Sequence, residues 1–129
     1  MALTVLKQKP LFAEKTPSID AVILVRDYVK DKLTSAVGTE VTLTARKVTR
    51  YHGLIDDESA ATRVGLALRY LAQLGYLKCI RTRKPHAYLV TQLGRLWALI
   101  CRWPQCSNDS SICGLHGCCP IHKLEVRKQ

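Results

Sequence analysis

Apolar residues recur every three or four positions between Ser59 and Leu74, which is the spacing of one face of an α-helix. Gly75 follows, and glycine often ends a helix because it readily adopts the left-handed conformation. The pattern predicts a long amphipathic helix that packs its apolar face into a core. The residues on that face are Ala61, Val64, Ala67, Leu68, Leu71 and Leu74.

After this helix the pattern changes to that of a β-hairpin. Residues 76–82 and 87–91 are rich in β-branched and aromatic side chains, and a turn is expected over residues 83–86. A further helix is predicted over residues 92–100. Its buried face is expected to contain Leu93, Leu96, Trp97 and Ile100.

The sequence before the long helix predicts two more helices and a short strand. The first helix begins after Thr16, ends at Gly38 and carries Arg26 on an otherwise apolar face. Residues 40–44 alternate in polarity, so we expect a short strand that pairs with the hairpin. The second helix is expected over residues 45–52.

Short polar side chains mark the beginnings of these helices. Thr44 is expected to cap the second helix and Asp56 the long one, because their oxygens can accept from free backbone N–H groups. Leu54 and Ile55 are expected to be buried in the turn between the two helices.

Two segments resemble the winged helix-turn-helix family. Residues 69–77, RYLAQLGYL, resemble the end of its recognition helix, and residues 88–96, YLVTQLGRL, resemble the end of its wing and the start of the following helix. The resemblance covers residues 18–100 and implies an α+β winged helix, with a three-helix core, a β-hairpin wing and an additional C-terminal helix. We expect a basic arm over 1–15, this domain over 16–100, and a small metal-stabilised, cysteine-rich module with a basic tail over 101–129.

The charge of the chain favours a polyanionic partner. Its 129 residues include 20 Lys and Arg against 10 Asp and Glu, a net charge of +10. Nucleic acid is the expected partner. No apolar run is long enough to span a bilayer, and the first residues do not resemble a secretion signal, so we expect a cytoplasmic protein with no membrane partner.

The wing, the second helix and the long helix carry the cations expected to contact nucleic acid. The leading hypothesis is DNA binding in transcription, as a regulator or as an initiation cofactor that also docks on a protein assembly. Acidic residues at the start of the long helix would repel a phosphate backbone, which keeps open an rRNA-binding structural role in the ribosome or another ribonucleoprotein. The candidate contacts are Arg46, Lys47, Arg50, Arg63, Lys78, Arg81, Arg83 and Lys84.

Five of the six cysteines lie between Cys101 and Cys119. A short tail with few apolar residues cannot build its own hydrophobic core. A structural zinc ion can take the place of that core by cross-linking four thiolate or imidazole ligands. Cys79 stands alone in the hairpin and is expected to be a small core residue. The candidate zinc ligands are Cys101, Cys106, Cys113 and Cys119, with Cys118, His116 and His122 as alternates.

A [4Fe–4S] cluster is the alternative to zinc, because a cysteine followed by proline, as at Cys119-Pro120, closes many cluster-binding runs. The segment from Cys101 to His116 is similar in span to the segment that holds the cluster ligands in iron–sulfur winged-helix sensors. This resemblance implies a redox-sensing role. A winged helix followed directly by a C-terminal cysteine module is also similar in plan to the beta subunit of archaeal transcription factor E. Disulfides, as in hyperthermophilic archaea, are a third option. No catalytic motif is present, so we expect no enzyme activity.

Overall fold

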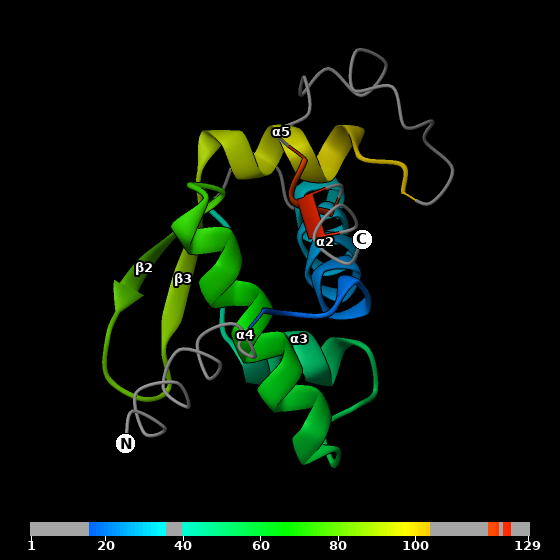
Figure 1. Ribbon diagram of the computed structural model, residues 1–129. Coiled ribbons are helices and arrows are strands. Elements are labelled where there is room, and N and C mark those ends of the chain that lie inside the picture. The colour runs from blue at the N-terminus through cyan, green and yellow to red at the C-terminus, as the bar shows by residue number, and fades with distance from the viewer. Residues whose placement is uncertain (1–15, 36–39, 104–118, 122, 125–129) are drawn as a thin grey trace, which may run out of the picture.

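The computed structural model describes residues 16–35, 40–103, 119–121 and 123–124. The expected N-terminal arm and Gly38 lie outside these residues. Helix α2 packs against α4 and α5, and α3 packs against α4. Figure 1 shows α5 crossing one end of α2, with the β2–β3 hairpin beside α4. The elements are α2 (Ile19–Ser35), β1 (Thr42–Leu43), α3 (Ala45–Tyr51), α4 (Glu58–Gln73), β2 (Leu77–Arg81), β3 (Ala87–Val90) and α5 (Gln92–Ile100).

The three strands form one antiparallel sheet in the order β1-β3-β2. In this sheet Thr42 lies opposite Leu89, and Lys78 lies opposite Leu89 from the other side. The hairpin and the short additional strand are therefore confirmed. Helices and a small antiparallel sheet share one core, so the fold is α+β.

Helix α4 confirms the long helix and its apolar face. Val64, Leu68 and Leu71 are fully buried, and Gly75 has φ +90°, the left-handed conformation expected after the helix. The predicted cap was wrong by one residue. The side chain of Asp57, rather than Asp56, accepts from Ala60 N at 3.0 Å, because the helix begins at Glu58 and the cap is the residue directly before it.

The turn before α4 is only partly as expected. Thr44 caps α3 as predicted, accepting from Lys47 N at 3.1 Å. Leu54 is half-buried, but Ile55 is 46% exposed, so its predicted burial was wrong. The carbonyl of Leu54 accepts from Asp57 N, and this tight turn leaves Ile55 at its outer edge.

Helix α5 turns a different face inward from the one predicted. Trp97 is buried as expected, together with Gly94 and Ala98. Leu93 and Leu96 are 38% and 48% exposed, so their predicted burial was wrong. The reason is close packing at Gly94, where an added Cβ would collide with the backbone carbonyl oxygen of Tyr76. Only the face of α5 that contains Gly94 can approach the Tyr76 backbone this closely.

Part of the C-terminal tail packs on the same core. Cys119, Ile121 and Leu124 are buried within the hydrophobic cluster of the helices and sheet. The hydroxyl of Tyr70 on α4 donates to the carbonyl of Pro120 at 2.8 Å. The boundary after residue 100 stays a prediction, but these tail residues contribute to the core of the main domain.

Candidate functional site

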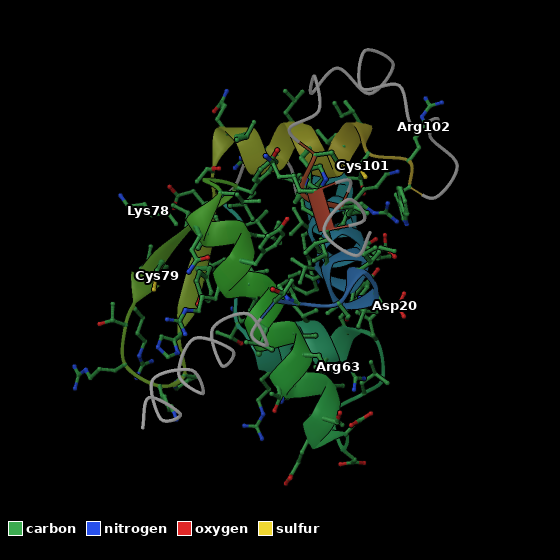
Figure 2. All side chains as sticks on the ribbon, in the orientation of Figure 1. Asp20, Arg63, Lys78, Cys79, Cys101 and Arg102 are labelled. Carbon is green, nitrogen blue, oxygen red and sulfur yellow. The ribbon has the colours of Figure 1, made fainter. Side chains whose placement is uncertain are left out.

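All eight basic residues predicted to contact nucleic acid are exposed. They belong to α3, α4, β2 and the hairpin turn, so two helices and the hairpin present positive charge to solvent. Figure 2 shows Arg63 on α4 and Lys78 on the hairpin. The residues are Arg46, Lys47 and Arg50 of α3, Arg63 of α4, Lys78 and Arg81 of β2, and Arg83 and Lys84 of the turn.

A groove separates α4 from the hairpin, and we call it the α4–hairpin groove. It consists of two hollows, of about 930 and about 610 Å³, which share the lining residues Thr62, Gly65, His86 and Tyr88 and are therefore adjacent. Among residues 16–35, 40–103, 119–121 and 123–124, no aspartate or glutamate lines either hollow. The cations that line the groove are Arg46, Arg69, Lys78 and Lys84.

The structure brings only some of the predicted contacts to this groove. Arg46, Lys78 and Lys84 line it, whereas the other five predicted residues are exposed outside its lining. Arg63, one of these five, donates to Ser59 Oγ on its own helix.

Sequence reasoning left Arg69 and His86 out of the candidate contacts. Both line the groove in the structure. Arg69 follows Thr62 by seven residues, about two helical turns, and so shares the face of α4 that lies away from the core. That periodicity places Arg69 among the side chains of the long helix that can reach a groove, whereas His86 needed the folded hairpin.

The acidic beginning of α4 lies outside the groove. Asp56, Asp57 and Glu58 are exposed, and none of them lines either hollow. The carboxylate of Asp57 accepts a hydrogen bond from Ala60 N. Along α4, negative charge therefore lies at the beginning of the helix, while the groove beside the rest of the helix is positive.

A second cluster lies where α5 ends against α2 (Figure 2). Cys101 and Cys119 are both buried, and the Cys119 thiol forms a hydrogen bond with Cys101. Arg26 of α2 donates from Nη1 to Cys101 Sγ at 3.4 Å and to the Trp103 carbonyl at 2.9 Å. Arg26 is itself buried and pairs with Asp27 at 2.9 Å, which confirms its place on the inner face of α2.

Hydrogen bonds make Cys101 acidic. The bond from Cys119 is the largest influence and lowers the pKa of Cys101, burial opposes it, and the Trp103 N–H and Arg26 lower it further, to about 5. The thiolate is therefore the favoured form at neutral pH, and thiolate is the form of cysteine that binds metal ions.

The structure places two of the four predicted zinc ligands together. Cys101 and Cys119 meet, while Cys106, Cys113, Cys118, His116 and His122 lie outside the described residues. Within the ranges that the structure describes, no group of three or more His, Cys, Asp or Glu side chains could hold a metal ion.

The prediction that Cys79 is a core residue was wrong. Cys79 is exposed, and its thiol donates to the Arg81 carbonyl at 3.3 Å. It lies on β2, an edge strand on which only Leu77 is buried.

Replacing Arg26 with methionine is expected to lower the free energy of unfolding by about 2 kcal/mol, because the Trp103 carbonyl and the Cys101 sulfur lose their donor. Urea unfolding followed by circular dichroism measures the change. The matched control is Arg102→Met, since Arg102 is exposed and its loss is expected to change stability by less than about 0.5 kcal/mol. Equal stability of the two variants would show that the Arg26 contacts contribute nothing.

In the part of the chain that the structure describes, no helix combines the length and apolar character needed to cross a membrane. Comparison of the chain with protein-family models, curated protein sequences and solved structures found no match.

Proposed function

We propose that this chain binds nucleic acid through the α4–hairpin groove and the hairpin turn, as a winged-helix DNA-binding protein of transcription. The observation that carries the proposal is the groove itself, which four cations and no carboxylate line among the residues that the structure describes. The net charge of +10 adds long-range attraction for a polyanion. A regulator and an initiation cofactor that docks on a larger protein assembly are both compatible with this surface.

The order of elements supports a winged-helix plan. Helix, strand, two helices and a hairpin follow one another, and the first strand completes a β1-β3-β2 sheet. In this plan α4 is the recognition helix and the β2–β3 hairpin is the wing. The exposed cations of both elements would neutralise phosphates, which gives affinity that falls as salt concentration rises.

Fluorescence anisotropy with a labelled DNA duplex tests the proposal. We expect binding at low salt, with the logarithm of the association constant falling by about 3 or more for each tenfold rise in salt, because each neutralised phosphate contributes about 0.9 to this slope. Absence of binding to any nucleic acid at about 50 mM salt would contradict the proposal.

An RNA duplex of the same sequence gives the second arm of this experiment. The exposed acids at the first turn of α4 favour the alternative role, an rRNA-binding component of a ribonucleoprotein, because they would oppose insertion of that turn into a DNA groove. Tighter binding to RNA than to DNA would favour this alternative and exclude the transcriptional role.

We also propose that the tail after α5 holds a structural metal ion. Cys101 and Cys119 would supply two thiolate ligands, and Cys106 and Cys113 the other two, with Cys118, His116 and His122 as alternates. The buried contact between Cys101 and Cys119 and the lowered pKa of Cys101 support this role. Zinc would cross-link a segment that has few apolar residues of its own, and a [4Fe–4S] cluster is the alternative.

Elemental analysis of the purified chain is expected to find about one zinc ion per molecule. Cys101→Ser should abolish most of this metal content, because it removes a buried ligand beside Cys119. Cys79→Ser is the matched control and should retain the metal, since Cys79 is exposed in the hairpin. Iron and sulfide in a coloured protein would establish the cluster instead, and a metal-free wild-type protein would exclude both.

A further inference from the structure

Gly65 lies in the middle of α4, where glycine is the least favourable residue except proline. Apart from its chain neighbours and the adjacent backbone of α4, a Cβ added at Gly65 would meet no atom within 4 Å. Gly94 is the contrasting case, because a Cβ there would collide with the Tyr76 backbone. Neither packing nor a left-handed conformation therefore explains glycine at position 65.

Gly65 lines both hollows of the α4–hairpin groove. Without a side chain, this position leaves the backbone of α4 open to close approach from the groove. The neighbouring lining residues Leu66, Leu77 and Tyr88 are largely apolar. The hydroxyl of Thr62, beside Gly65, already donates to the Glu58 carbonyl at 3.1 Å. The groove at Gly65 thus offers apolar surface between cations, with the polar side chain of His86 also in its lining.

This arrangement matches the chemistry of a DNA strand, in which apolar deoxyribose rings alternate with anionic phosphates. Arg69 and Lys78 lie in the larger hollow, and Arg46 and Lys84 in the smaller one, so positive charge lies on both sides of Gly65. Deoxyribose lacks the 2′-hydroxyl of ribose and is therefore the more apolar sugar, so the apolar part of this surface matches DNA better than RNA.

We propose that the backbone of one strand of duplex DNA lies in the α4–hairpin groove, with a deoxyribose against Gly65. This inference rests on the proposed function. Phosphates on either side of this sugar contact Arg69 and Lys84. The acidic first turn of α4 stays outside the bound strand. The missing side chain at Gly65 is the feature that admits the sugar.

The test compares Gly65→Ala and Gly65→Leu in anisotropy measurements with a labelled DNA duplex. We expect Gly65→Leu to weaken binding about tenfold or more and Gly65→Ala about threefold, because added carbons occupy the place of the sugar. Gly65→Ala should at the same time raise Tm by about 3 °C, because alanine favours the helix. Thr34→Leu, which places a leucine side chain on the exposed face of α2, is the control and should bind as the wild type does.

Wild-type affinity in a folded Gly65→Leu protein would overturn the inference, and wild-type affinity in Gly65→Ala would do so if Gly65→Leu fails to fold. Tighter binding of the wild type to an RNA duplex or to single-stranded DNA of the same sequence would also overturn it. If the Gly65 variants bind normally while removal of hairpin cations weakens binding, the proposed function stands and the Gly65 inference fails. If the wild type binds no nucleic acid, both fail.

Discussion

Replacing Arg81, Arg83 and Lys84 together with alanine is expected to weaken DNA binding about 100-fold at about 0.1 M salt. The three side chains are exposed in and beside the hairpin turn, and Lys84 also lines the α4–hairpin groove. If each neutralises one phosphate, the variant should also lose about 3 from the slope of log affinity against log salt. Salt titrations followed by fluorescence anisotropy measure both quantities.

The control for this variant removes the same charge from elsewhere on the molecule. Lys30, Arg102 and Lys123 are exposed, and none of them lines the groove. Their triple alanine variant has the same net charge as the hairpin variant, so it reports the general effect of charge alone. Equal loss of affinity in the two triple variants would show that the hairpin is not the contact surface.

Gly94→Ala is expected to lower the free energy of unfolding by about 3 kcal/mol, a large part of the stability of a small domain. The added Cβ would collide with the Tyr76 carbonyl oxygen, which also accepts hydrogen bonds from Thr91 N and Thr91 Oγ1. Either α5 moves away from the sheet or these bonds are lost. Urea unfolding followed by circular dichroism checks the change.

The same substitution at Gly65 is the matched control, because its Cβ would meet nothing within 4 Å. Gly65→Ala should therefore stabilise the protein by up to about 1 kcal/mol. Opposite signs for the two glycines would confirm how α5 packs. A Gly94→Ala protein as stable as the wild type would contradict the packing of α5 against Tyr76.

Local patterns predicted most of the elements, because helix periodicity, capping and turn chemistry act over a few neighbouring residues. The apolar spacing of Val64, Leu68 and Leu71 identified the inner face of α4, and Gly75 its end. Alternating strand residues on both sides of a short turn identified the hairpin. Thr44 could be predicted as a cap because its hydrogen-bond donor, Lys47 N, lies in the helix that it caps.

The errors at Leu93, Leu96 and Cys79 arose where a distant partner decides the outcome. Leu93 and Leu96 have the spacing of a buried face, but the Tyr76 backbone admits only the face that contains Gly94. Cys79 has the small apolar side chain of a core residue, yet it lies on an edge strand whose outer face meets solvent. Neither effect can be read from neighbouring residues.

The candidate site shows the same division. Exposed cations on α3, α4 and the hairpin could be predicted from charge and periodicity, whereas the groove that gathers Arg46, Arg69 and Lys84 depends on how these elements pack. The contact of Arg26 with Cys101 joins residues 75 positions apart. The sequence placed Arg26 on the inner face of α2 but could not name its partner.

An NMR titration of the isotope-labelled chain with a short DNA duplex tests the central claim most directly. Amide resonances of α4 between Thr62 and Gln73 and of the hairpin between Leu77 and Tyr88 should shift on addition of DNA, because these segments line the groove. The outer face of α2 should not respond. Shifts confined to α2 and α5, or no shifts at all at low salt, would contradict the account.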